Sequence, residues 1–335
     1  LLLFLESQNL NRIKMNKRDF LKSAAALAGA TALTPLASAS SKANDASRSF
    51  SGITSAARDI NVKATDKVVL KKALGLGMIT EDLSLTDKFK LAKDIGFDGV
   101  ELNSPVDFSM KEIMEAKEKA GIETPTVVNK DHWSAPLSDP DPEVRKKCII
   151  SVAKSLEEIK ELGGDTVLVV PGVVNDKVSY EDAYITSQNS IRELIPYAEK
   201  TGMQIGLENV WNNFLISPIE AKRFIDEINH PLVGWYFDIG NVLRYGWPEH
   251  WIKTLNRRIM KLHIKEFSRE LMNSAGLWEG FKVDLLKGDN NWPMVMKTVS
   301  DINHQGGWLT AEVSGGDRNH LKKISEQMDE IIGYL

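Results

Sequence analysis

The chain has 335 residues, of which 42% are hydrophobic and 26% charged, with a formal net charge of −4 and a pI near 6.0. This is the composition of an ordinary globular protein, long enough for one large domain or two small ones. Lys and Arg form no cluster after the N-terminus, so we expect no nucleic-acid partner. The single cysteine, Cys148, has no partner within the chain, which excludes an internal disulfide.

The N-terminal region has the pattern of an export signal. Residues 15–39 run from a basic start through an apolar Ala/Leu stretch to a small-residue cleavage site. The segment KRDFLK, residues 17–22, resembles a twin-arginine (Tat) signal with Lys in place of the first Arg. The alternative, a membrane helix, is disfavoured because the run is short and rich in Ala. We interpret residues 1–14 as an upstream extension and 40–70 as a disordered mature N-terminus, and expect a periplasmic protein without stable membrane insertion.

From residue 71 onward, strand and helix patterns alternate without a break. Strands are predicted at 71–79, 96–102, 122–128, 165–171, 203–208, 232–238, 259–264 and 306–313. Helices are predicted at 85–95, 109–120, 142–162, 180–200, 217–228 and 247–255, from 291 onward, and at 317–335. The connection 267–291 is long enough to be a lid or binding loop. Eight such alternations predict an α/β fold, a single (β/α)8 TIM barrel over residues 71–335, with its active site at the carboxyl ends of the strands.

Four of the predicted strands end in side chains that bind metals. Glu208, Asp238 and Glu312 close the fifth, sixth and eighth strands, and His263 lies near the end of the seventh. In a barrel these ends meet on one face, where three carboxylates without a cation would repel one another and raise a pKa. Three oxygen donors and one nitrogen favour a hard divalent ion, with Mn²⁺ the first choice and Mg²⁺, Co²⁺ or Zn²⁺ as alternatives. We therefore predict a single divalent metal site.

The motifs GLENVWN, WYFDIGN, HIKE and LTAEVSG resemble the xylose-isomerase-like TIM-barrel superfamily. The resemblance covers residues 71–335 and is strongest to the sugar isomerase and epimerase branch, which includes ketose 3-epimerases and hydroxypyruvate isomerases. It implies that Glu208, Asp238, His263 and Glu312 bind one divalent ion. It also implies that Glu208 and Glu312 flank the substrate and exchange its proton, as the catalytic pair.

The same residue set allows more than one reaction. An ion on the substrate carbonyl and neighbouring hydroxyl acidifies the C–H between them through an enediolate, and a carboxylate removes the proton. Return of the proton gives epimerisation or isomerisation, whereas loss of a β-oxygen gives elimination, as in cleavage of a 3-keto-glycoside. Export and the lack of a phosphate-binding Gly loop favour a non-phosphorylated sugar or glycoside. A non-catalytic sugar-binding protein is the third alternative. An endonuclease is disfavoured, because the endonucleases of the superfamily need more histidines at the strand ends than this chain offers.

Six further residues are candidate substrate ligands. Arg269 matches an Arg that contacts substrate in the ketose epimerases, and Asn241 stands where those enzymes have a His, which leaves orientation of the substrate carbonyl open. Lys265 shares a strand face with His263. Trp211, like Trp133, follows a strand end and either stacks on a sugar ring or covers the barrel. His132 and Glu101 complete the set as expected hydrogen-bonding partners of sugar hydroxyls.

The resemblance also implies a possible homo-oligomer, because relatives in the family often form dimers or tetramers.

Overall fold

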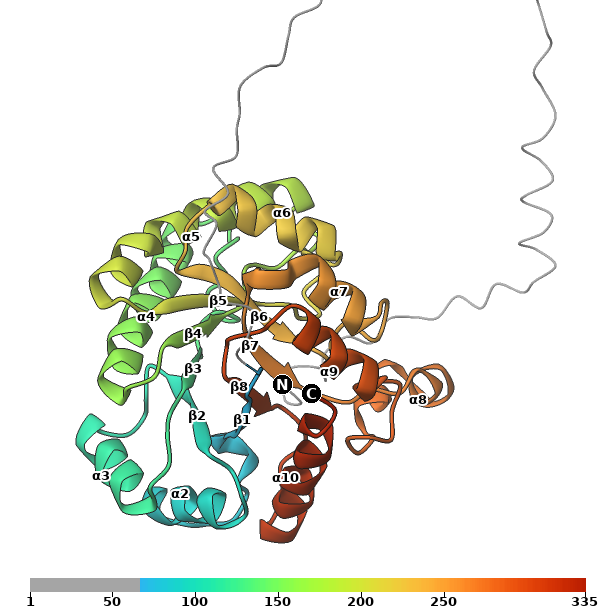
Figure 1. The fold of residues 1–335 in the computed structure, drawn as a ribbon. Helices are drawn as coiled ribbons and strands as arrows, with labels where there is room; N and C mark the ends of the chain where they lie inside the picture. Colours follow the sequence, from blue (N-terminus) through green and yellow to red (C-terminus); the bar gives the residue numbers. More distant parts are fainter. Residues whose placement is uncertain (1–66) are drawn as a thin grey trace, which may run out of the picture. The chain divides into compact units, whose positions relative to one another are not determined.

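The computed structural model describes residues 67–335, so the predicted extension (1–14), export signal (15–39) and most of the tail (40–66) lie outside the described residues. Eight parallel strands form a closed barrel in chain order, and β8 pairs with β1 to complete it (Figure 1). The strands are β1 (Lys71–Gly75), β2 (Gly99–Ser104), β3 (Thr126–Asn129), β4 (Thr166–Val169), β5 (Gln204–Glu208), β6 (Val233–Asp238), β7 (Ile259–Ile264) and β8 (Trp308–Ala311). The predicted (β/α)8 barrel is confirmed.

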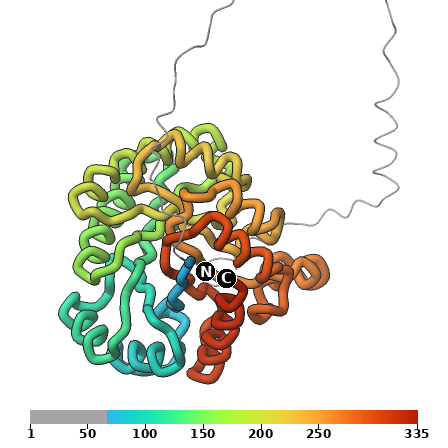
Figure 2. Tube along the Cα trace, viewed as in Figure 1, coloured from blue at the N-terminus to red at the C-terminus, as the bar shows by residue number. Residues whose placement is uncertain are grey.

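Helices surround the barrel, and each strand is followed by at least one of them (Figure 2). The α-helices are α2 (Leu85–Asp94), α3 (Met110–Ala120), α4 (Pro142–Leu162), α5 (Tyr180–Thr201), α6 (Pro218–Ile228), α7 (Pro248–Leu255), α8 (Arg269–Ala275), α9 (Trp292–Asp301) and α10 (Arg318–Ile332). Short 3₁₀ turns are η2 (Leu76–Met78), η3 (Asn256–Arg258) and η4 (Leu277–Phe281).

Capping residues explain why several helix boundaries agree with the sequence patterns. The Asp141 side chain accepts a hydrogen bond from the Glu143 N–H, and Pro142 occupies the first turn of α4. The same helix ends at Gly163, whose φ of 77° lies in the left-handed region. α6 begins in the same way, with Ser217 as cap before a proline. Both helices therefore have the predicted length.

Other boundaries differ from the predicted ones. β1 ends at Gly75 and continues as a 3₁₀ turn, and β2 begins at Gly99 because Gly96, with a φ of 98°, turns the chain after α2. The predicted loop 267–291 contains α8 and η4. α8 forms there because the Ser268 side chain accepts from the Leu271 N–H and caps its first turn.

The core between the strands and the helices is apolar, whereas the interior of the barrel is partly polar. Every residue of β4 and β6 is buried, as expected for strands covered on both faces. Val68 and Leu70, at the end of the segment predicted to be disordered, are also buried. Inside the barrel, Thr126, Tyr236 and Thr310 are fully buried. Within residues 67–335, no helix has the length and apolar character needed to cross a membrane.

Candidate metal centre and active site

Four side chains converge at the carboxyl ends of consecutive strands. Glu208 and Asp238 are the last residues of β5 and β6, and Asp238 pairs in register with His263 of β7. Glu312 directly follows β8. Each of the four residues offers a ligand atom, and these atoms lie within 4.8 Å of one another. His263 Nδ1 is 3.0 Å from Glu208 Oε1 and 3.1 Å from Glu312 Oε2.

The cluster is buried on the barrel side and open on the solvent side. Glu208, Asp238 and His263 are at most 5% exposed, whereas the Glu312 side chain is 49% exposed. Burial raises the pKa of Glu208 to about 8, and the nearby Glu312 carboxylate acts in the same direction. Burial likewise raises the pKa of Asp238. Burial thus disfavours negative charge on Glu208 and Asp238, whereas the Lys265 ammonium and His263 hold the pKa of Glu312 well below its usual range.

These four residues fit a divalent cation. Asp238 Oδ1 accepts from the Asn241 N–H at 2.7 Å, but Oδ2 is buried and has no hydrogen-bond partner among residues 67–335. Lys265 Nζ lies 3.1 Å from Asp238 Oδ2 without the geometry of a hydrogen bond, and 3.1 Å from Glu312 Oε2. Such an unsatisfied buried oxygen, beside two more carboxylates and an imidazole, suits a hard divalent ion.

Asn209, which the sequence interpretation missed, ties the ends of β5 and β6 together. Its Oδ1 accepts from Trp235 Nε1 and from the Asp238 N–H, both at 3.0 Å, and its Nδ2 donates to the Asp238 carbonyl at 2.8 Å. Asn241, a predicted substrate ligand, donates from Nδ2 to the Asn209 carbonyl. These bonds hold the Asp238 backbone in place. The available sequence signal was the amide that follows Glu208 directly.

Glu101, another predicted substrate ligand, lies deeper than expected. It is in the middle of β2, is 5% exposed, and its Oε1 is 3.0 Å from His263 Nε2. Its Oε2 accepts from Thr126 Oγ1 at 2.6 Å and from the Tyr236 hydroxyl at 2.7 Å. Tyr236 was not anticipated, although strand alternation puts it on the same face as Asp238. Together these residues form the floor beneath the cluster.

His132 and Trp133 occupy the loop after β3, as predicted. His132 is 3% exposed, and its Nδ1 accepts from the Val170 N–H at 3.4 Å. Burial lowers the pKa of His132 to about 4, so this imidazole is neutral at pH 7. Trp133 lies edge-on to it, with ring centroids 5.6 Å apart, and is 44% exposed. The pair offers a neutral hydrogen-bonding group beside an accessible aromatic ring.

Aromatic side chains from the segment after β7 cover Trp211. Its ring centroid is 4.8 Å from those of Trp278 and Phe281, and its Nε1 donates to the Asn241 carbonyl. Phe281 in turn lies 5.5 Å from Lys265 Nζ, which contacts the carboxylate cluster. Trp278 is 43% exposed. An aromatic strip therefore leads from the cluster toward solvent.

Arg269 does not contact the cluster in this structure. Its Nε and Nη2 donate to the carbonyls of Leu243 and Gly246 at 2.7 and 2.6 Å, and its guanidinium stacks on Trp247. These contacts connect α8 to the loop after β6. The substrate contact of Arg269 stays a prediction.

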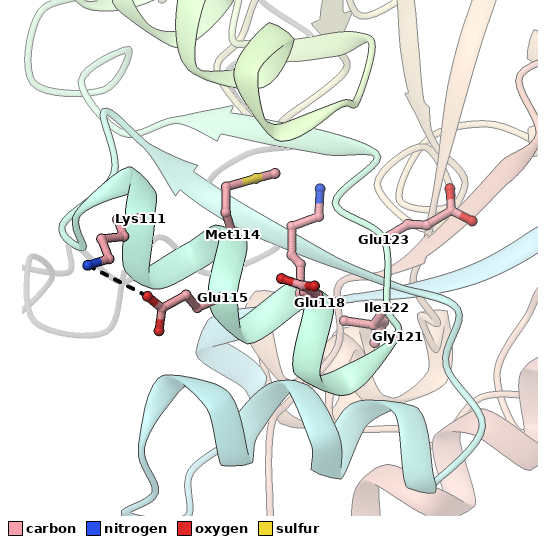
Figure 3. A pocket seen from close by; sticks show the side chains of 8 residues that line it. Lys111, Met114, Glu115, Glu118, Gly121, Ile122 and Glu123 are labelled. Atoms are coloured by element: carbon pink, nitrogen blue, oxygen red, sulfur yellow. Dashed lines mark ion pairs between the residues drawn. The ribbon is translucent and has the colours of Figure 1, made fainter.

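A surface depression on α3 lies away from this chemistry. Figure 3 shows its lining, which includes Lys111, Met114 and Glu118 of α3 and Glu123 of the following turn. Lys111 pairs with Glu115 of the same helix at 3.9 Å. The residues that line this depression run along α3 from Lys111 to the turn before β3, whereas the cluster lies at the carboxyl ends of the strands. This depression offers no group to the metal centre.

Comparisons with known proteins agree with the geometry. A family model for the twin-arginine translocation signal matches residues 14–34, so the chain carries a Tat export signal, typically directing a protein to the periplasm. A candidate L-ribulose-5-phosphate 3-epimerase of Escherichia coli is 23% identical over 248 residues, covering 69% of this chain and 84% of that protein.

Two solved structures have the same fold. The 3-keto-D-glucoside 4-epimerase of Escherichia coli superposes with a TM-score of 0.65 at 16% identity, covering 78% of this chain and 98% of the other. The D-psicose 3-epimerase of Clostridium cellulolyticum H10 gives 0.61 at 19% identity, covering 78% and 96%. A family model described as the xylose isomerase-like TIM barrel matches residues 89–332. The chain therefore belongs to the xylose isomerase-like TIM-barrel family.

Proposed function

We propose that the protein is a divalent-metal-dependent sugar isomerase or epimerase that moves a proton α to a carbonyl on a non-phosphorylated sugar. The observation that carries this proposal is the convergence of Glu208, Asp238, His263 and Glu312 within 4.8 Å at the barrel mouth, with a buried Asp238 oxygen that accepts no hydrogen bond among residues 67–335. When bound there, a divalent ion would stabilise the negative charge that develops on the sugar oxygens. Mn²⁺ is the proposed ion because the donors are mostly carboxylate oxygens.

Glu208 and Glu312 are the proposed proton-transfer pair. One oxygen of each carboxylate lies close to His263 Nδ1, at 3.0 Å for Glu208 and 3.1 Å for Glu312. A sugar carbon held beside the cluster would therefore have a proton acceptor and a proton donor within reach. Glu208 is buried, while Glu312 has access to solvent and to solvent protons. One of the two, as a carboxylate, takes the α-proton at an Oε atom. The other, as a carboxylic acid, gives its proton to the opposite face of the same carbon, so the number of protons on the pair is unchanged.

The surrounding groups suit a neutral polyhydroxyl ligand. His132 is neutral and buried, Lys265 offers an ammonium beside two carboxylates, and Trp211 packs on Phe281, which lies 5.5 Å from the Lys265 ammonium. We include Asn241 in the substrate set because its Oδ1 lies 3.4 Å from Lys265 Nζ. Arg269, held by two carbonyls of the loop after β6, remains in the proposed set. The Escherichia coli relative is named for a phosphorylated sugar. For this protein we propose an unphosphorylated sugar instead, because export favours such a substrate.

Elimination at the same centre is the second candidate. The exposed ring of Trp278 and the strip behind it would suit the aglycone or second ring of a 3-keto-glycoside. One carboxylate would abstract the same α-proton, a C=C bond would form in the sugar, and the β-oxygen would leave with a proton from the other carboxyl group, which cleaves that glycosidic bond. The two reactions use the same carboxylates and differ in whether a group leaves the substrate.

Proton exchange in D₂O tests the proposal and separates these reactions. The Mn²⁺-loaded protein is incubated with ketoses and 3-keto-glycosides, and the products are examined by NMR and mass spectrometry. Deuterium in recovered sugar supports isomerisation or epimerisation, whereas released aglycone supports elimination. The Glu208→Gln and Glu312→Gln variants should lose at least about 100-fold in rate, while Glu270→Gln, an exposed carboxylate on α8, should not change it. Full exchange by both site variants would refute the assigned roles, and sugar binding without exchange in the wild type would indicate a binding protein.

A further inference from the structure

Glu101 is buried beneath the cluster and faces one edge of the His263 ring. Its Oε1 is 3.0 Å from His263 Nε2, whereas Glu208 and Glu312 face Nδ1, on the other side of the ring. Nδ1 and Nε2 of an imidazole point in different directions, so Glu101 lies behind the histidine as seen from the carboxylate cluster. A sugar bound over the cluster would be separated from Glu101 by the His263 ring.

The second oxygen of Glu101 is fully engaged. Thr126 Oγ1 donates to Oε2 at 2.6 Å and the Tyr236 hydroxyl donates to it at 2.7 Å. Both donors are fully buried, and Tyr236 also packs its ring 4.3 Å from that of His263. A carboxylate has no proton to give, so with two hydroxyls fixed on Oε2, the remaining oxygen accepts the Nε2–H of His263.

The orientation of the ring, with Nε2 toward Glu101 and Nδ1 toward Glu208 and Glu312, bears on which histidine nitrogen meets the cation. A neutral imidazole carries one proton, and if that proton is on Nε2, the Nδ1 lone pair is directed at the position between Glu208 and Glu312. A carboxylate on the far nitrogen also makes the near nitrogen a stronger donor to a metal. Glu101 is 5% exposed and His263 1%, so this contact is shielded from bulk solvent.

We infer that Glu101 is a positioning residue of the metal centre, which holds the His263 ring and its Nε2 proton so that Nδ1 binds the divalent ion. This inference rests on the proposed function, since it assigns a role toward the ion. It replaces the expectation that Glu101 binds a sugar hydroxyl. Thr126 and Tyr236 act one step further away, by fixing the orientation of the Glu101 carboxylate.

The Glu101→Gln variant tests the inference through metal affinity rather than activity. Mn²⁺ dissociation constants are measured by water-proton relaxation and by calorimetry on the full chain, with folding checked by circular dichroism. Glu101→Gln should bind Mn²⁺ about 10–100-fold more weakly, because an amide is a weaker, uncharged acceptor and its NH₂ would face two hydroxyl donors. Tyr236→Phe, which removes one of those donors, should give a smaller loss of affinity in the same direction.

Glu158→Gln is the matched control. Glu158 is also 5% exposed and also accepts a hydroxyl hydrogen bond, from Ser104 Oγ at 2.6 Å, but it lies on α4 and does not contact the cluster. It should bind Mn²⁺ as the wild type does. Equal affinity of wild type, Glu101→Gln and Tyr236→Phe would overturn the inference while leaving the metal-dependent function intact.

A second measurement keeps the two proposals separable. In ¹⁵N-histidine-labelled protein without metal, the Nε2–H resonance of His263, identified by its loss in His263→Gln, should be shifted downfield by the carboxylate. It should move upfield in Glu101→Gln and remain in place in Glu158→Gln. If the wild type bound no divalent ion, the proposed function would fail, and this resonance would still report whether Glu101 holds the Nε2 proton. An unchanged resonance in Glu101→Gln would refute that contact.

Discussion

A buried histidine far from the metal centre makes the unfolding free energy depend on pH. His304 is 4% exposed, and its Nε2 has no hydrogen-bond partner within the described part of the chain. Burial lowers the pKa of His304 from 6.5 to about 4, and the Lys261 ammonium acts in the same direction. The folded protein therefore resists protonation of this ring, whereas the unfolded chain accepts a proton at ordinary pH values.

The sign and size of the effect follow from this difference. Between the unfolded pKa and the folded pKa, the unfolded state binds more protons, so the unfolding free energy falls as the pH falls. Above pH ~6.5 His304 does not lower the unfolding free energy. Relative to that range, the unfolding free energy is lower by about 2 kcal/mol at pH ~5 and by about 3 kcal/mol at pH ~4, at about 1.4 kcal/mol per pH unit. Below pH ~4 both states are protonated and the contribution stays constant.

The assay compares His304→Gln with the wild type by urea unfolding at pH 7.5, 6.0 and 5.0, with chelator present so that metal binding does not contribute. The wild type should lose about 2 kcal/mol more than the variant between the first and last pH. Other buried groups, such as His132, are present in both proteins and cancel in the difference. His250→Gln, which removes an exposed histidine of α7, should follow the wild type. A difference between wild type and His304→Gln that does not change with pH would refute the reasoning.

Two further substitutions test the groups around the cluster. Lys265→Met removes the ammonium 3.1 Å from Asp238 Oδ2 and should lower the unfolding free energy of the metal-free protein by about 3 kcal/mol. Added Mn²⁺ should then raise its melting temperature by more than it does for wild type, and an equal rise would contradict the charge argument. Glu266→Leu leaves the N–H groups of Trp292, Asn290 and Leu286 without their acceptor, at about 1–3 kcal/mol for each one buried. Faster tryptic cleavage in segment 282–287 and a lower urea midpoint should follow, and unchanged cleavage would show that Glu266 does not anchor the segment.

The metal-ligand cluster could be predicted from the sequence because each ligand sits at a strand end. Once the barrel is inferred, its geometry brings those ends together without any knowledge of side-chain contacts. The position of Glu101 could not be obtained in this way. Alternation along β2 indicates that Glu101 faces the barrel interior. How deep in the barrel Glu101 lies depends on the stagger between neighbouring strands, which pairs Glu101 of β2 with Gly75 of β1.

The contacts of Arg269 depend on two segments that are distant in sequence. Its partners are carbonyls of the loop after β6, and their positions follow from how that loop packs against α8. The helix itself was accessible to prediction, since Ser268 followed by Glu270 is a helix-start signal within a segment interpreted as a loop. Local signals therefore determine where elements begin, while side-chain partners across loops require the folded structure.

The balance of charge at the cluster bears on which substrate the protein accepts. Glu101, Glu208, Asp238 and Glu312 contribute four negative charges when ionised, and Lys265 contributes one positive charge. A divalent ion would reduce the remaining excess to a single negative charge. A phosphorylated sugar would bring further negative charge toward this centre. A neutral sugar meets no such repulsion, which is an electrostatic argument, independent of export, in favour of the proposed unphosphorylated substrate.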